Sequence, residues 1–242
     1  MGSSPPPSLL YYMKLTLLTA AAAAISCTAG AAIVNVDFNS TNNGGGATYS
    51  GLAAAPDQAG TNALWNGISN NTFGSITGLG GTDLPDSTGA ATDIDITIGR
   101  QDGGFTGTGN NLLKDYLFLV PGQSSTFTLS GLSPQASYNV YIYSMGDTAG
   151  QGGTFTYNGT SLSTSASPLN GTTFVAGNNY VVFTGVTSAE DGTAGFTWAG
   201  VSSNTHSALN GIQIEIVPEP TSVALLGLGA VGLGLIRRRR VS

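Results

Sequence analysis

Apolar and polar residues alternate along most of residues 32–216, which is the pattern of β-strands with one buried face. Between residues 93 and 98, for example, three isoleucines alternate with two aspartates and a threonine. No stretch of this middle region sustains a helical period of apolar residues. The strands predicted from alternation and composition span residues 33–38, 94–98, 117–120, 125–129, 138–145, 154–157, 160–163, 180–184, 195–199 and 209–216.

Turn signals separate these strands. Asn158-Gly159 stands between two of them and is the strongest hairpin signal of the chain, and Pro121-Gly122 marks another turn. The segment 131–134, followed by Tyr138, resembles the tyrosine corner of fibronectin-like sandwiches, in which a tyrosine hydroxyl bonds back to the preceding turn. Many short strands joined by Gly-rich turns predict an all-β domain, a β-sandwich, over residues 32–216.

Charge is scarce and unevenly placed, since charged residues make up 8% of the chain. In the middle region two basic residues, Arg100 and Lys114, stand against twelve acidic ones, which gives a net charge of −10. This balance argues against nucleic acid or anionic lipid as a partner of the domain, because both require basic patches. Neutral sugars and cations remain as partner classes.

The N-terminal 31 residues have the organisation of a secretory signal peptide. Lys14 precedes an apolar run over residues 15–25, and the triplet Ala29-Gly30-Ala31 fits the small-residue pattern that signal peptidase cleaves. We therefore expect cleavage after Ala31. The first twelve residues have the character of an extension, so that Met13 is the expected true start.

Cys27 is the single cysteine of the chain and offers an alternative for this end. Residues 24–27 loosely resemble a lipobox, in which the cysteine is acylated, although alanine replaces the usual leucine three positions before it. If signal peptidase cleaves after Ala31 instead, the mature domain has no cysteine and therefore no disulfide and no thiol nucleophile.

The C-terminal segment, residues 217–242, has three parts. An apolar stretch over residues 222–236 predicts a transmembrane helix; as a helix it rises roughly 22 Å, short of the ~30 Å hydrocarbon core. The arginines that follow would stay on the cytoplasmic side. The residues that flank the apolar stretch are Val217, Pro218, Glu219 and Pro220 before it and Arg237, Arg238, Arg239 and Arg240 after it.

This arrangement resembles the PEP-CTERM sorting segment, a tail that is also labelled an ice-binding protein C-terminal domain. The resemblance implies that exosortase cleaves the chain near the triplet Pro218-Glu219-Pro220. It also implies passage through the inner membrane to the cell surface or extracellular matrix of a Gram-negative-type bacterium. It also implies a jelly-roll-like sandwich whose last strand runs into the tail. A plain membrane anchor is the alternative. An ice-binding face is not expected, because Thr154, Thr156 and Thr160 do not recur at a fixed period.

The sequence predicts no enzyme and no catalytic residue. His206 is the single histidine, in a Ser/Asn-rich stretch, and no nucleophile, zinc or phosphate-binding motif accompanies it. Glycoside hydrolysis uses two carboxylates. The sequence offers three neighbouring pairs, which are more typical of solvated or metal-bound loop residues: Asp83 with Asp86, Asp93 with Asp95, and Glu190 with Asp191.

Two kinds of ligand remain. Calcium takes six to eight oxygen ligands, and Asp37, Asp57 and Asp191 are the ligands we expect for a structural calcium ion, because each lies at a strand end or in a loop. A sugar requires an aromatic face with polar neighbours. Alternatively, the large aromatic residues fill the core. The aromatic candidates for sugar binding are Tyr141, Tyr143, Trp65 and Trp198.

The sequence therefore favours an exported, non-catalytic structural protein of the cell surface or exopolysaccharide matrix. Its expected partners are signal peptidase, exosortase, the membrane before processing, and exopolysaccharide. A carbohydrate-binding module is the first alternative, and a carbohydrate-active enzyme is the second.

Overall fold

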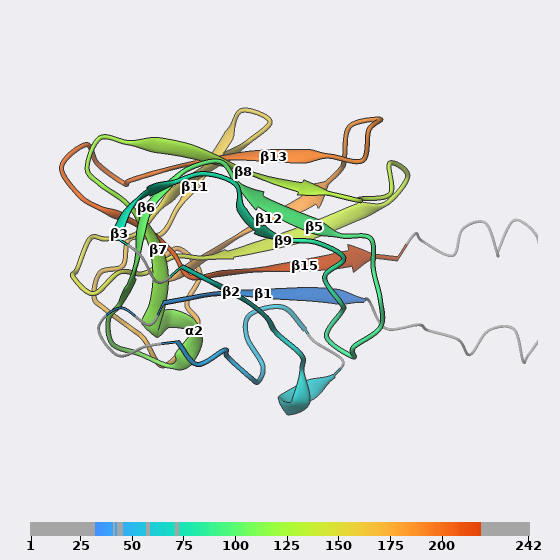
Figure 1. Cartoon of the computed structure of the whole chain (residues 1–242), viewed down its shortest axis with the longest axis horizontal. Coiled ribbons are helices and arrows are strands. Elements are labelled where there is room, and N and C mark those ends of the chain that lie inside the picture. The colour runs from blue at the N-terminus through green and yellow to red at the C-terminus, as the bar shows by residue number, and fades with distance from the viewer. Residues whose placement is uncertain (1–31, 41, 43–45, 57–58, 71–72, 219–242) are drawn as a thin grey trace, which may run out of the picture. The chain divides into compact units, whose positions relative to one another are not determined.

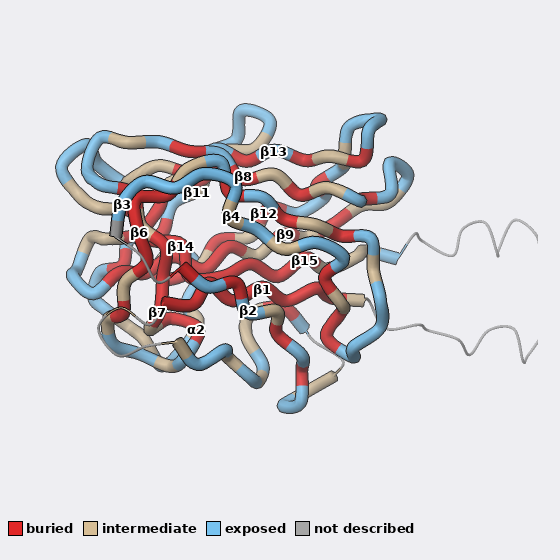
Figure 2. The backbone as a smooth tube through the Cα atoms, in the orientation of Figure 1, coloured by how far each residue is buried: buried red, intermediate tan, exposed pale blue. Residues whose placement is uncertain are grey.

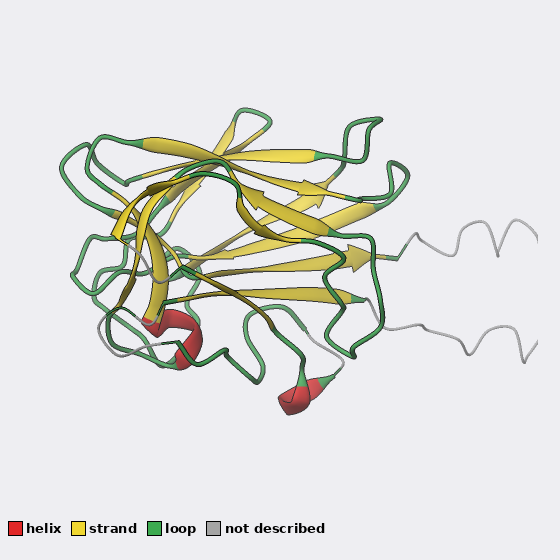
Figure 3. Cartoon of the chain, viewed as in Figure 1, coloured by secondary structure: helices red, strands yellow, loops and turns green. Residues whose placement is uncertain are grey.

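The computed structural model describes residues 32–40, 42, 46–56, 59–70 and 73–218 (Figure 1). This part of the chain is almost entirely β-structure, arranged in three sheets (Figure 3). The prediction of an all-β fold is confirmed, and the arrangement is consistent with a β-sandwich. The predicted signal peptide and transmembrane helix lie outside the described residues. Within those residues, we find no helix with the length and apolar character needed to cross a membrane.

The first sheet contains both ends of the domain. Its strand order is β12-β9-β15-β1-β2, and all neighbours are antiparallel except β1 and β2, which are parallel. The strands are β1 (Ile33–Asn39), β2 (Asn66–Ser69), β9 (Ser137–Tyr143), β12 (Tyr180–Val186) and β15 (Gly211–Val217).

The second sheet has six strands and lies over one face of the first. Apolar side chains from both sheets meet in one buried cluster that includes Val36, Ile212, Phe127 and Trp198. Figure 2 shows the buried residues along β1 and β15. In sheet order, the strands are β11 (Thr160–Ser163), β10 (Thr154–Tyr157), β13 (Ala194–Ala199), β8 (Ser124–Ser130), β5 (Asp95–Ile98) and β4 (Leu79–Gly81).

A third sheet closes one end of the sandwich. Its strands run steeply across the ends of the others in Figure 1, and Leu117, Leu119 and Leu209 extend the main core into it. A short helix, α2 (Asn111–Lys114), connects β6 to β7 and is capped by the Asn110 side chain, which accepts a hydrogen bond from the Leu113 N–H at 2.9 Å. In sheet order, the strands are β14 (Ser207–Leu209), β7 (Asp115–Leu119), β6 (Gln101–Thr106) and β3 (Phe73–Ile76).

The other face of the first sheet is also covered. The 3-10 helix η1 (Gly60–Asn62) belongs to the segment that crosses this face, and a second apolar cluster forms beneath it around Trp65, Tyr143, Leu112 and Leu113. Consequently, polar residues on this face of β1 and β15 are buried, including Asn35 and Gln213.

Two local predictions are confirmed. The chain turns at Asn158-Gly159 between β10 and β11, with positive φ angles of 45° and 77° at the two turn residues, as a two-residue hairpin requires. Tyr138 forms the expected corner, since its hydroxyl accepts a hydrogen bond from the Ser133 N–H at 2.8 Å. The tyrosine therefore fixes the turn between β8 and β9.

The two ends of the domain meet. The Ile216 N–H donates a hydrogen bond to the Ala32 carbonyl at 2.9 Å, so that the start of β1 lies beside the end of β15. The third sheet lies at the opposite end of the sandwich (Figure 1). The first and last strands of the described part of the chain therefore lie side by side in one sheet.

Candidate functional site

The outer face of the third sheet carries an aromatic floor. Phe105 in β6 pairs directly with Tyr116 in β7, with ring centroids 5.9 Å apart. Phe118 lies two residues further along β7 and therefore on the same face. Its cross-strand partner is Gly103, which has no side chain to cover the ring.

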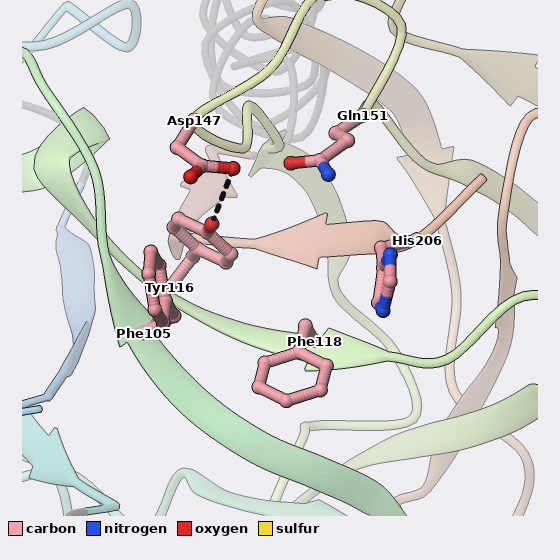
Figure 4. Close-up of a pocket in the computed structure, with 6 residues that line it drawn as sticks. All are labelled: Phe105, Tyr116, Phe118, Asp147, Gln151 and His206. Carbon is pink, nitrogen blue, oxygen red and sulfur yellow. Dashed lines mark hydrogen bonds between the residues drawn. The ribbon is translucent and has the colours of Figure 1, made fainter.

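Polar groups surround this floor. Figure 4 shows Asp147 and Gln151 on the loop after β9 and His206 just before β14, all directed toward the aromatic rings. The loop approaches β6 closely because Gly107 has no side chain: a Cβ there would lie 2.9 Å from the Cβ of Asp147. The His206 and Phe118 rings make an edge contact at 5.7 Å. Together, the six residues line a cavity of about 240 Å³.

The hydrogen bonding of the cavity leaves acceptors and donors for a ligand. Tyr116 Oη donates to Asp147 Oδ1 at 3.2 Å. Burial and the Asp147 carboxylate raise the pKa of Tyr116, so the phenol stays protonated and remains a donor. His206 lines the cavity with its imidazole beside Phe118. The cavity thus combines an apolar floor with a carboxylate, an amide and an imidazole, the composition of a site for a small polar ring.

The structure corrects the predicted ligand-binding aromatic residues. Trp198 and Tyr143 are 0% exposed and Trp65 is 4% exposed, so these three fill the two cores and have no surface to offer. Tyr141 is partly buried on the outer face of β9, where its hydroxyl donates to Glu215 at 3.3 Å. Burial and the Glu215 carboxylate raise the pKa of Tyr141 to about 12. None of the four lines the cavity.

The predicted calcium ligands are not brought together. Asp37 is buried in β1, whereas Asp191 lies in the exposed turn before β13 and accepts hydrogen bonds from Thr193 at 2.7 and 3.0 Å. Asp57 lies outside the described residues. In the part of the chain that the structure describes, no group of three or more His, Cys, Asp or Glu side chains is placed to hold a metal ion.

The residues that line the cavity were largely missed by sequence reasoning. His206 was noted only as the single histidine of the chain, without a motif that gives it a role. The one signal was in β7, where Tyr116, Leu117, Phe118 and Leu119 are apolar on both faces. A strand with two apolar faces is either covered on both of them or exposes an apolar patch. On the outer face of β7, Phe118 is partly exposed, whereas Tyr116 is 4% exposed. Asp147 and Gln151 gave no signal, because a loop contributes them.

The predicted sorting motif begins where the domain ends. Val217 is the last residue of β15 and pairs with Ser137, and Pro218 is exposed immediately after it. Proline has no N–H to continue the ladder, which suits it to this position. The other predicted motif residues lie outside the described residues: Glu219, Pro220, Arg237, Arg238, Arg239 and Arg240.

Comparison with known proteins identifies this tail. The family model of the PEP-CTERM protein-sorting motif matches residues 217–240. A search of curated proteins found none that matches the chain. The motif is recognised by exosortase and implies export and membrane-anchored processing in bacteria. The match covers the tail and leaves the β-domain unassigned. The chain is therefore an exosortase substrate that carries a PEP-CTERM sorting motif at residues 217–240.

Proposed function

We propose that this protein is a non-catalytic component of the cell surface or exopolysaccharide matrix whose β-domain binds a neutral sugar residue. Signal peptidase would release the domain at Ala32, and exosortase would process the tail after Val217. The observation that supports sugar binding is the cavity of the third sheet, where Phe105, Tyr116 and Phe118 lie beside polar side chains. Exopolysaccharide is then the partner that matches the place of export.

The position of the cavity suits a protein that is attached through its tail. His206 precedes the start of β15, and the sorting motif follows its end. Seven residues of strand separate the two by about 20 Å. A tail held at the membrane therefore leaves the cavity on the far end of the domain, where it is open to polysaccharide.

The electrostatics of the domain favour a neutral glycan. Asp147 lies at the cavity, and the middle region has a net charge of −10. An anionic polysaccharide would be repelled by both. A neutral ring can place one face on Phe105 and Phe118, which are partly exposed, and donate hydroxyl hydrogen bonds to Asp147 and Gln151.

Binding is favoured over catalysis because the cavity provides one carboxylate. Glycoside hydrolysis uses two facing carboxyl groups about 5–9.5 Å apart. Asp147 is the one acidic residue among those that line the cavity, and it already accepts the Tyr116 hydroxyl. The carboxylates noted in the sequence instead hold turns: Asp95 accepts the Asp83 N–H at 2.7 Å, and Asp86 accepts the Thr88 N–H at 2.9 Å.

The test is glycan binding by the full chain, purified in detergent. A glycan array that includes the host exopolysaccharide would identify a ligand, and calorimetry would then give its affinity. We expect Phe118→Ala and His206→Ala each to weaken binding by at least about tenfold, because truncating an anchor residue commonly removes more than 1.4 kcal/mol. Tyr141→Ala is the matched control, a partly exposed aromatic residue outside the cavity, and is expected to bind normally.

Two outcomes would overturn the proposal. One is the absence of binding to any neutral glycan by wild-type protein that is folded, as shown by cooperative thermal unfolding. The other is binding that survives both cavity substitutions and is lost with Tyr141→Ala, which would place the site on the first sheet. Unfolding temperatures of the variants distinguish a lost contact from a lost fold.

A further inference from the structure

Two carboxylates are buried together beneath the outer face of the first sheet. Asp37 in β1 is 0% exposed, and Asp115, the first residue of β7, is 1% exposed. Strands β1 and β7 contact each other. Both acids adjoin the turn that leads into β15: Asp37 pairs with Gly211, and the Asp115 carbonyl accepts a hydrogen bond from Asn210 Nδ2 at 2.9 Å. Burial and the negative charge of Asp115 raise the pKa of Asp37.

One loop, the segment 46–49, closes over both acids. The Gly46 N–H donates to Asp115 Oδ2 at 2.8 Å, and the Tyr49 N–H donates to Asp37 Oδ2 at 2.6 Å. Between them, Thr48 Oγ1 accepts a hydrogen bond from Asn39 Nδ2 at 2.9 Å. The loop is thus hydrogen-bonded to the side chains of Asp37, Asn39 and Asp115.

Glycines on the two strands beside β1 leave room for this cluster. Asp37 pairs with Gly211 on one side and with Gly67 on the other. A Cβ on Gly67 would overlap Thr48 Oγ1 and lie 2.8 Å from Asn39 Nδ2. A Cβ on Gly211 would lie 2.7 Å from a methyl carbon of Leu112. The space beside Asp37 is therefore occupied by Thr48 and Asn39 on the side of Gly67 and by Leu112 on the side of Gly211.

The second oxygen of each acid has no partner. Asp37 Oδ1, Asp115 Oδ1 and Asn39 Oδ1 are buried and have no hydrogen-bond donor among the described residues. Asn39 itself is 2% exposed. No basic side chain neutralises the acids, since the ion pair found among the described residues joins Arg100 to Asp102. Two buried carboxylates without a counter-charge are strongly unfavourable, so that the cluster must take up either a cation or protons.

We propose that the cluster of Asp37, Asn39 and Asp115 binds one calcium ion, which bridges β1 to β7 beneath the loop 46–49. Two carboxylates balance the double charge of the ion, and all three donors are oxygens, as a hard cation prefers. No cysteine or histidine belongs to the cluster, which disfavours zinc. The inference is independent of sugar binding, because its readouts are calcium binding and thermal stability.

The experiment measures the calcium response of the full chain in detergent after chelation. Trp65 and Trp198 are both buried, so tryptophan fluorescence follows unfolding of the domain. Calcium at about 100 times its dissociation constant is expected to raise Tm by about 5–10 °C, and calorimetric titration should give one ion per chain. Asp37→Asn and Asp115→Asn should lose this response, whereas Asp191→Asn, at an exposed carboxylate, should keep it.

Each alternative predicts a different outcome. If the two acids share a proton instead, calcium leaves the wild-type Tm unchanged and the proposal is wrong. If all three variants respond as the wild type does, calcium binds elsewhere and the site is wrong. Magnesium is expected to give a smaller shift, since it dehydrates reluctantly, and an equal shift would overturn the assignment to calcium. If either asparagine variant fails to fold, titration of the wild-type chain still decides whether one ion binds.

Discussion

Replacing Gly131 by alanine is expected to destabilise the domain by about 4 kcal/mol or more, or to prevent folding. Gly131 has a φ angle of 70°, directly after β8. A Cβ at this position would overlap the carbonyl oxygen of Asp93 and lie 2.5 Å from its carbonyl carbon. Both atoms belong to the backbone just before β5, so no side-chain movement relieves the clash.

The clash would spread because Gly131 lies where several interactions meet. Ser130, its neighbour, pairs with Asp95 between β8 and β5. Leu132 packs in the main core, and the Ser133 N–H donates a hydrogen bond to the Tyr138 hydroxyl. A displaced corner would therefore disturb the sheet, the core and the tyrosine corner at once.

The matched control is Gly185→Ala. Gly185 has the same φ angle of 70°, yet no heavy atom lies within 4 Å of the position that a Cβ would take. Alanine there should cost only the backbone penalty of about 1–2 kcal/mol. Thermal unfolding of the full chain, followed by tryptophan fluorescence, compares the two. An equal loss of stability in both variants would contradict the steric explanation and assign the effect to backbone conformation.

How much of the fold the sequence predicts depends on how local the signal is. Tyr138 and Asn158-Gly159 act within a few residues of themselves, and both predictions are confirmed. Strand β6 gave no signal, because its residues include two glycines together with the buried Gln101 and Asp102. It is held as a strand by pairing with β7 and β3, which the local pattern does not contain.

Tyr143, Trp65 and Trp198 were predicted to bind sugar but are buried, and the reason is related. Alternation along β9 predicts two faces, but it does not predict that the second face is covered by another layer. Tyr143 bonds to Gln213, and Gln213 Nε2 donates to Asn35 Oδ1 at 2.8 Å. These polar residues have the sequence pattern of a solvated face, yet they form a buried network beneath the segment that contains Trp65.

The hydroxyl groups of the second sheet illustrate the same limit. Along the chain, Thr154, Thr156 and Thr160 do not recur at a fixed period. In the sheet, however, Thr156 pairs with Ser161 on one side and Thr197 on the other, and Thr197 pairs with Thr126. A row of hydroxyl groups across four strands therefore arises from residues that are far apart in sequence. Such a row is visible only once strand order is known.

The candidate cavity combines residues that a local sequence pattern indicates with residues that only the tertiary fold brings together. Tyr116 and Phe118 were within reach of pattern analysis, since they stand at alternate positions of one strand. Asp147 reaches them from a loop 31 residues away in sequence from Tyr116, and no local rule places it there. The proposed calcium cluster is similar: the sequence predicts Asp37 as a ligand, whereas Asp115 is brought near it only by the third sheet.

Substituting Glu219 by alanine is expected to abolish processing of the tail and release from the membrane. Glu219 is the central residue of the triplet Pro218-Glu219-Pro220, which lies near the start of the matched motif. In an exosortase-bearing host, wild-type protein should lose its tail and leave the inner membrane. The variant should remain there at full length. Cell fractionation and the mass of the intact chain measure both effects.

Glu215→Ala is the matched control for this effect. It removes a carboxylate four residues upstream, outside residues 217–240, whose contacts are with Asn139 and Tyr141 on the surface of the first sheet. This variant should be processed as the wild type is. Because β15 ends at Val217 and Ile216 bonds to Ala32, we expect the β-domain to fold without the tail. Processed wild-type protein and the trapped Glu219→Ala variant should therefore share one unfolding temperature. If Glu219→Ala were released normally, the tail would act as a plain membrane anchor and the exosortase assignment would be wrong; if both variants were trapped, a folding defect upstream of the motif would explain the result instead.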